Sequence, residues 1–149
     1  MKIKVAWVGK TKEPAIQALT GEYLKRISRY AGIEGFAVKD EAAILAMASG
    51  ETRGARRAPC KLILLDSRGK QSSSEELAAF LAREQLSALP LLFAIGGSDG
   101  FDDHTRRTAG FILSLGKMTL PHELARIVLL EQIYRAFTIL KGHPYHTGH

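Results

Sequence analysis

The sequence predicts an α/β fold in which a largely parallel sheet is flanked by helices. Short apolar runs with strand character alternate along the chain with amphipathic segments of helical period, a pattern that favours parallel sheets. Polar and glycine-rich loops follow several expected strands, at the positions where such sheets bind ligands. The 149 residues fit a single domain, residues 1–149, with enough chain to bury a substantial core.

The first expected elements are a strand, a helix and a second strand. Ile3, Val5 and Trp7 alternate with polar or small residues, which is the period of a half-buried strand. Apolar side chains at three- and four-residue spacing then predict an amphipathic helix over residues 13–30. The second strand is expected over residues 33–38.

The middle of the chain combines an alanine-rich segment, a loop and a buried strand. Residues 41–49 have helical propensity, whereas residues 50–59 mix glycine, arginine and proline without apolar periodicity. We therefore expect a helix followed by a basic loop. A short buried strand over residues 62–65 then ends on Asp66.

A capping signal predicts the next helix. Ser73 and Glu76 have the spacing of a capping box, so a helix is expected from there to about Ala88. The next strand is expected over residues 91–95.

Two further helices are expected in the last third of the chain. Asp102 and Asp103 are candidate caps for a helix through Phe111. A final helix is expected to begin near Pro121, whose fixed dihedral angle suits the first helical position, and to extend to about Lys141.

The final helix has two opposed polar stripes. On a helical projection Glu131, Arg135 and Thr138 lie opposite His122 and Arg126, and apolar residues fill both flanks between them. Two apolar flanks favour a subunit interface and hence a homodimer. Burial of both flanks within one subunit is the alternative.

Composition restricts the class of protein and its partners. The net charge of +6 favours a polyanionic partner such as RNA, although a solvated basic face gives the same value. The single cysteine, Cys60, excludes an internal disulfide and a structural zinc site built on cysteines. The first residues lack the pattern of a signal peptide, and no apolar run is long enough to span a membrane, so a cytoplasmic location without membrane contact is expected.

The C-terminal segment is basic and aromatic. His143, His146 and His149 are spaced by three residues, but no cluster of Asp, Glu or Cys accompanies them, so no metal is expected. A metal hydrolase built on these histidines is the alternative. The favoured interpretation is stacking and hydrogen bonding to an unstacked RNA base.

Three loops carry the expected chemistry, at residues 65–70, 96–100 and 115–120. Paired glycines after a buried strand allow the backbone to approach a ligand closely, although a tight turn would also use them. No P-loop and no complete dinucleotide-binding glycine pattern is present. We therefore expect a ligand held mainly by backbone and apolar contacts.

Four motifs in order resemble one known family over nearly the whole chain. They are Leu65-Asp66-Ser67-Arg68-Gly69-Lys70, the run from Phe93 to Gly100, the run from Leu115 to His122, and Tyr134-Arg135-Ala136-Phe137 leading to Pro144-Tyr145-His146. Together they closely resemble the SPOUT-class methyltransferases that methylate N3 of a pseudouridine in large-subunit ribosomal RNA. The resemblance implies a C-terminal trefoil knot, a homodimer, and S-adenosylmethionine as the methyl donor.

The resemblance also implies roles for individual residues. Expected to bind S-adenosylmethionine are Leu65, Gly96, Gly97, Leu115, Gly116, Lys117, Met118, Thr119 and Leu120. Expected to contact the ribosomal RNA are His122, Arg126, Tyr134 and Tyr145. Arg135 and His146 are the expected catalytic residues: His146 as a base or an orienting donor, because histidine titrates near neutral pH, and Arg135 as the group that stabilises the developing anion.

Two alternatives remain open from the sequence. A non-catalytic RNA-binding factor of ribosome assembly would need only the basic surface. A SPOUT methyltransferase that acts on transfer RNA would keep the same cofactor motifs.

Overall fold

The computed structural model describes residues 1–52, 55–56 and 58–147; residues 53–54, 57 and 148–149 lie outside it, as do the side chains of residues 52, 55–56 and 146. Its centre is a five-stranded sheet in the order β2-β1-β6-β5-β7, in which every neighbouring pair is parallel. The strands are β1 (Lys2–Val8), β2 (Gly32–Val38), β5 (Lys61–Gln71), β6 (Leu91–Ile95) and β7 (Phe111–Ser114). The expected parallel α/β sheet is confirmed.

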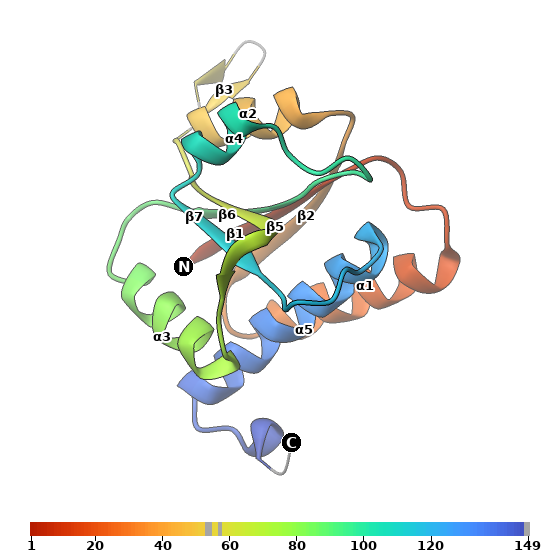
Figure 1. Cartoon of the computed structure of the whole chain (residues 1–149). Helices are drawn as coiled ribbons and strands as arrows, with labels where there is room; N and C mark the ends of the chain where they lie inside the picture. The colour runs from red at the N-terminus through yellow and green to blue at the C-terminus, as the bar shows by residue number, and fades with distance from the viewer. Residues whose placement is uncertain (53–54, 57, 148–149) are drawn as a thin grey trace.

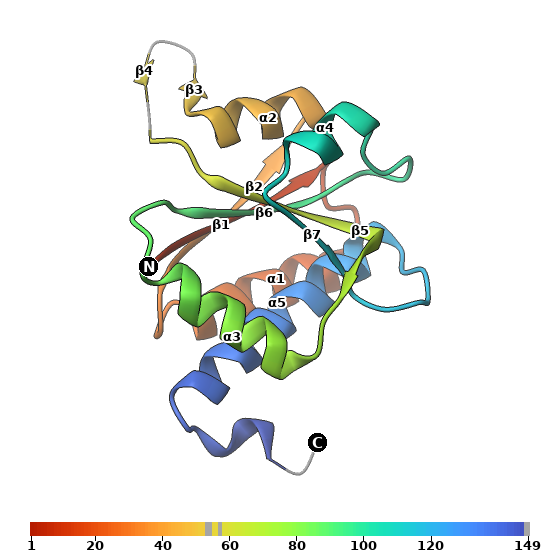
Figure 2. The same cartoon turned by 60° about the vertical axis from the view of Figure 1, so that its left-hand side comes forward.

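Helices cover both faces of the sheet (Figures 1 and 2). One layer contains α1 (Pro14–Ile27), α3 (Ser74–Glu84) and α5 (His122–Leu140), and the other contains α2 (Glu41–Ser49) and α4 (Asp103–Thr108). Within the first layer α5 packs against both α1 and α3. A short antiparallel pair, β3 (Glu51–Thr52) and β4 (Ala55–Arg56), lies in the segment expected to be a loop, and a 3-10 turn, η1 (Pro144–His146), follows α5.

The strands divide their side chains between two apolar clusters because successive residues point to opposite faces. Ile3, Val5 and Trp7 of β1 pack into the cluster shared with α1, α3 and α5, whereas Ala6 packs with Ile44 of α2 on the other side. β6 is buried along its whole length, as expected for a central strand of a parallel sheet.

Local signals placed most helix starts correctly. Asp40 caps α2 through the N–H of Ala43, and Ser73 with Glu76 forms the expected capping box at the start of α3. In α5, Pro121 is the N-cap residue rather than the first helical residue. Helices α1 and α3 end at Ile27 and Glu84, before the expected ends.

The expected helix through Phe111 is wrong. Asp102 does cap a helix, but α4 ends at Thr108, and Phe111 begins β7. The apolar run from Phe111 to Leu113 pairs with β5, and this burial against a neighbouring strand overrides a continued helix.

Strand β5 is also longer than the expected segment 62–65 and has a bulge. Leu65 and Lys70 both align with Leu113 of β7, so the residues between them leave the regular ladder. Gly69 closes this bulge: a Cβ at that position would lie 2.6 Å from the backbone oxygen of Ile112. The bulge projects Asp66 and its neighbours at the edge of the sheet where the strands end.

Among the described residues, no helix is long and apolar enough to cross a membrane. The trefoil knot stays a prediction.

Candidate functional site

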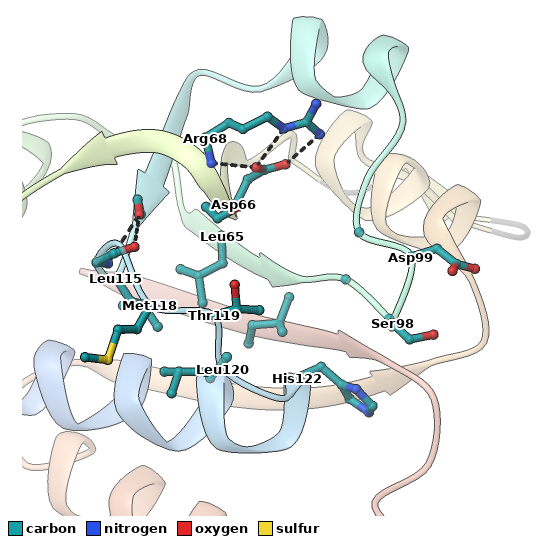
Figure 3. A pocket seen from close by; sticks show the side chains of 18 residues that line it. Leu65, Asp66, Arg68, Ser98, Asp99, Leu115, Met118, Thr119, Leu120 and His122 are labelled. Carbon is teal, nitrogen blue, oxygen red and sulfur yellow. Dashed lines mark hydrogen bonds and ion pairs between the residues drawn. The ribbon is translucent and has the colours of Figure 1, made fainter.

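A pocket of about 320 Å³ lies beyond the carboxyl ends of β5, β6 and β7 (Figure 3). It is formed by the β5 bulge, the loop after β6, the loop after β7 and the start of α5, which is the edge where parallel sheets bind ligands. Of the residues expected to bind S-adenosylmethionine, the pocket is lined by Leu65, Gly96, Gly97, Leu115, Gly116, Met118, Thr119 and Leu120. Lys117 is not among the lining residues.

The loop after β6 is closely packed on itself. A Cβ at Gly96 would lie 3.2 Å from the carbonyl carbon of Gly100, tighter than ordinary contact, while Gly100 has a φ of +71°. Gly97 is less constrained, because a Cβ there would meet only Val8 at 3.7 Å. A side chain at Gly96 would therefore require Gly100 to move by a few tenths of an ångström, which makes Gly96 the more constrained of the two glycines.

The loop after β7 is held by one side chain. The Ser114 hydroxyl donates to the carbonyl of Gly116 at 2.9 Å and accepts from its N–H at 3.2 Å, while Gly116 has a φ of +148°. In Figure 3, Thr119 and Leu120 lie between Leu65 and the start of α5. The pocket is thus lined mainly by backbone and small or apolar side chains.

One charged group at the pocket rim was quoted in a motif but given no role from the sequence. Asp66, with a side chain only 7% exposed, accepts from the backbone N–H of Arg68 at 2.8 Å and pairs with the Arg68 and Arg106 guanidinium groups at 3.3 and 3.7 Å. Burial alone would raise the pKa of Asp66, but the hydrogen bonds from Arg68 and the nearby positive charges outweigh it and hold the pKa below its ordinary value. Asp66 therefore fixes the bulge that forms one wall of the pocket.

The start of α5 joins the pocket to the loop after β1. His122, expected to contact RNA, is exposed and lines the pocket. Glu123 accepts a hydrogen bond from the backbone N–H of Lys12 at 2.9 Å. This contact joins the start of α5 to the loop after β1.

Arg126, also expected to contact RNA, lies in the interior with 1% of its surface exposed. Its guanidinium stacks on the Trp7 ring at 4.0 Å and donates to the hydroxyls of Thr11 and Thr20 at 2.8 and 3.3 Å. Among the described residues, Arg126 Nε and Trp7 Nε1 are buried without a hydrogen-bond partner, and burial lowers the pKa of Arg126. Arg126 thus packs in the interior near the start of α5, and its side chain does not reach the surface.

Three other expected residues, Tyr134, Arg135 and Tyr145, lie close together towards the C-terminal end of α5. The Tyr145 hydroxyl lies 3.0 Å from both carboxylate oxygens of Glu131, and Arg135 donates to Glu131 at 3.1 Å. The Tyr134 and Tyr145 rings meet edge to face at 4.9 Å, and the Arg135 guanidinium lies 5.3 Å from the Tyr145 ring centre. The structure thus brings together Tyr134, Arg135 and Tyr145, with Glu131 at their centre.

Helix α1 adds residues to this cluster that the sequence analysis did not single out. Tyr23 meets Tyr134 edge to face at 6.4 Å, and the Arg26 guanidinium lies over both rings. Burial, together with a hydrogen bond to Glu131, raises the pKa of Tyr23 to about 12. No motif linked α1 to the tail, because this contact exists only after α1 and α5 pack side by side.

The His146 backbone belongs to η1, but its side chain lies outside the described residues, as does all of His149. His143 accepts a hydrogen bond from the Tyr145 N–H through Nδ1 and so caps this turn. Within the described ranges, no group of three or more His, Cys, Asp or Glu side chains is arranged to hold a metal ion.

The pocket lies at the start of α5, whereas the C-terminal cluster of Glu131, Tyr134, Arg135 and Tyr145 lies towards its other end. Figures 1 and 2 show that the C-terminal turn follows the end of α5 remote from the loop that leads into it. Arg135 follows His122 by 13 residues on α5, which corresponds to about 20 Å along the helix axis at 1.5 Å per residue. A small substrate bound in the pocket therefore cannot touch Arg135 of the same chain.

Sequence comparison identifies close relatives of the same length. Proteins named ribosomal RNA large subunit methyltransferase H are 58% identical in Koribacter versatilis, with all of both chains aligned, and 47% identical in Geobacter sulfurreducens, with 98% of this chain and 99% of the relative aligned.

Solved structures show the same fold at low identity. A probable methyltransferase from Bordetella pertussis matches 91% of this chain and 94% of its own with a TM-score of 0.60 and 10% identity. A probable methylase family protein from Haemophilus influenzae matches 98% of this chain and 70% of its own with a TM-score of 0.57 and 14% identity. A SpoU methyltransferase from Streptomyces viridochromogenes in complex with S-adenosylmethionine matches 90% of this chain and 57% of its own with a TM-score of 0.50 and 14% identity.

The family model described as a predicted SPOUT methyltransferase matches residues 1–146, which include the pocket, all of α5 and the C-terminal turn. On this match and the full-length relatives, the chain belongs to the SPOUT methyltransferase family.

Proposed function

We propose that this protein transfers a methyl group from S-adenosylmethionine to N3 of a pseudouridine in large-subunit ribosomal RNA. The full-length relatives named as large-subunit ribosomal RNA methyltransferases support the reaction and the class of RNA. The glycine-rich pocket at the strand ends supports the cofactor. The single observation that carries the proposal is that this pocket is assembled from the same three loops that resemble the family's cofactor motifs.

The pocket fits S-adenosylmethionine chemically. Its backbone amides and carbonyls suit the edge of an adenine ring, and the apolar side chains of Leu65, Ile95 and Leu120 suit its faces. Gly96, Gly97 and Gly100 line the pocket without side chains, so a ligand can lie against bare backbone in this loop. When bound, this cofactor supplies an activated methyl group on a sulfonium.

A homodimer with composite active sites follows from the separation along α5. Since Arg135 lies about 20 Å along α5 from His122 at the pocket, we infer that a second copy brings its C-terminal cluster to that pocket. Apolar side chains near the start of α5 support this contact: Leu124 is 47% exposed and Met118 is 85% exposed. The dimer explains how residues from both ends of α5 serve one reaction.

The proposed reaction assigns separate tasks to the C-terminal cluster, to His146 and to His122. The ring nitrogen N3 is protonated at neutral pH, so its proton must leave as the new N–C bond forms. We assign removal or orientation of that proton to His146, and stabilisation of the negative charge on the base to Arg135. Tyr134 and Tyr145 offer aromatic surface for an unstacked base, while His122 contacts the RNA from the pocket side. Arg126 is left out of the RNA-contact set because it is buried.

The family's trefoil knot and a cytoplasmic location remain part of this proposal. A ribosomal substrate supports the location, and the resemblance of the four motifs to the family supports the knot.

The test is methyl transfer to ribosomes by the purified protein with radiolabelled S-adenosylmethionine, followed by mass spectrometry of both ribosomal RNAs. We expect one methylated pseudouridine in the large-subunit RNA, and a loss of about 10²–10³-fold in the rate for Arg135→Ala with cofactor affinity unchanged. Transfer RNA serves as the competing substrate. Methylation of transfer RNA alone, or cofactor binding without transfer to any RNA, would replace the proposal with one of the two alternatives.

A further inference from the structure

We infer that Glu131 is the positioning residue that fixes the C-terminal part of the active site, by holding Tyr145 and Arg135 in one arrangement. The inference rests on the proposed function and adds a residue whose role no motif indicated. Glu131 lies on α5, one helical turn before Arg135, and its carboxylate faces the C-terminal turn.

The contacts of Glu131 join two separate segments. Both carboxylate oxygens accept from the Tyr145 hydroxyl at 3.0 Å, and Oε1 also accepts from Arg135 Nη2 at 3.1 Å. Tyr145 is separated from α5 by the turn that contains Gly142, which has a φ of +66°. The hydroxyl contact with Glu131 therefore fixes where this turn directs the tail.

Partial burial makes this carboxylate more effective than a surface ion pair. The side chains of Glu131 and Arg135 are 19% and 17% exposed, so water screens their interaction less than it screens an exposed pair. The Arg135 guanidinium lies over the Tyr145 ring, so the three groups constrain one another. Hydrogen bonds to an ionised acceptor are the stronger kind, which favours a glutamate at this position.

Helix α1 supplies a third connection to the same carboxylate. The pKa of Tyr23 is raised to about 12 by burial and by its hydrogen bond to Glu131, with further effects of Tyr145 and Arg26. The Tyr145 pKa is also raised, by burial and then by Glu131. Both phenols are protonated at neutral pH, as tyrosines ordinarily are, and the raised pKa values reflect the cost of ionising them beside the Glu131 carboxylate.

Enzyme kinetics on the full-length protein test the inference. The variants are Glu131→Ala, Glu131→Gln and Tyr145→Phe, with Glu75→Gln as a control that removes one exposed negative charge from α3. We expect Glu131→Ala to lower kcat by about 10²-fold, the scale of a displaced reactive group, while the affinity for S-adenosylmethionine and the dimer mass stay unchanged. Glu131→Gln, which keeps one acceptor oxygen, should restore part of this loss, and Glu75→Gln should match the wild type.

The double variant Glu131→Ala with Tyr145→Phe separates positioning from independent effects. If Glu131 acts through Tyr145, the double variant loses no more than the worse single variant. Wild-type kcat in Glu131→Ala, or losses that multiply in the double variant, would overturn the inference.

A spectroscopic measurement keeps this result separate from the proposed reaction. With ring-labelled tyrosine, NMR of the wild-type protein should show a pKa of about 12 for Tyr23 and a raised pKa for Tyr145. Glu131→Gln should lower both pKa values and shift the Tyr145 signal. If the wild type transfers no methyl group, the proposed function fails, and these spectra still decide whether Glu131 holds the tail. Unchanged tyrosine signals in a folded Glu131→Gln variant would contradict the inference.

Discussion

The two ends of α5 carry different kinds of chemistry. At its start, a pocket is lined mainly by glycines and small or apolar side chains, together with Asp66, Arg68, Asp99 and His122. At its end, Glu131, Arg135 and Tyr145 form a cluster of charged and aromatic side chains. A backbone-lined pocket suits a small cofactor of fixed shape, whereas side chains that stack and donate suit a nucleic-acid base.

The separation of the two ends is the basis of the proposed composite site. His122 and Arg135 are about 20 Å apart along α5, and the proposal gives each end half of the groups that the reaction requires. Substitutions at the two ends should therefore have separable effects: cofactor affinity at the start of α5, and transfer rate at its end.

The largest effect at the pocket end is expected for Gly96→Val. Its side chain would collide with the backbone of Gly100, so the loop must open, and the affinity for S-adenosylmethionine should fall by about 10–100-fold, as for an overpacked site costing 1–3 kcal/mol. Gly21→Val on α1 is the matched control, because Gly21 is exposed, does not line the pocket and has nothing within 4 Å of its Cβ. Calorimetric titration measures both affinities. Equal affinities in two folded variants would remove the Gly96 loop from the cofactor site.

A smaller effect, on the free energy of unfolding, is expected for substitutions of Arg126, which is buried near the start of α5. Arg126→Met keeps most of the side-chain volume that packs on Trp7. It also removes a buried guanidinium whose Nε has no hydrogen-bond partner among the described residues. The free energy of unfolding should therefore change by less than about 1.5 kcal/mol. Arg126→Ala should cost about 2–4 kcal/mol through the cavity left beside Trp7. Denaturant unfolding measures both values. A folded Arg126→Met variant that no longer binds ribosomes would return Arg126 to the RNA-contact set.

The smallest effect concerns the pH dependence at the pocket rim. The pKa of Asp66 in the folded state lies below its ordinary value of 3.8. Asp66 therefore stabilises the folded state at pH values above 3.8, and this stabilisation is lost as the pH falls through the lower, folded-state pKa. In Asp66→Asn the free energy of unfolding should fall less steeply over this acid range. An identical acid slope in the wild type and Asp66→Asn would show that Asp66 is not held by Arg68 and Arg106.

Local sequence signals predicted most of the elements, for physical reasons that are themselves local. The capping box at Ser73 and the alternation of Ile3, Val5 and Trp7 act within a few residues, so the sequence alone reveals them. Strand β7 was missed because the Asp102 cap favours a helix, while the pairing of Phe111 with β5 depends on a distant strand.

The site shows the same division between local and distant information. The pocket loops were predicted because their motifs are contiguous in the sequence. Arg126 was expected at the surface, and only the packing of Trp7, Thr11 and Thr20 around it accounts for its burial. Glu131 was known as part of a polar stripe, but its contact with Tyr145 requires the chain to turn back after α5.

The central claim, that each active site combines the pocket of one chain with the tail of another, is tested most directly by mixing two variants that each impair one half of the site, assayed at an S-adenosylmethionine concentration too low to fill the Gly96→Val pocket. Gly96→Val and His146→Ala are coexpressed with different tags, and mixed dimers are isolated by tandem purification. Each mixed dimer has one of its two sites with both halves intact, so pure mixed dimers should recover about one half of wild-type methyl transfer. About half of the dimers in an equal mixture are mixed dimers, so the mixture before purification should recover about one quarter. If verified mixed dimers show no transfer above either parent variant, each site is built within a single chain and the claim is wrong.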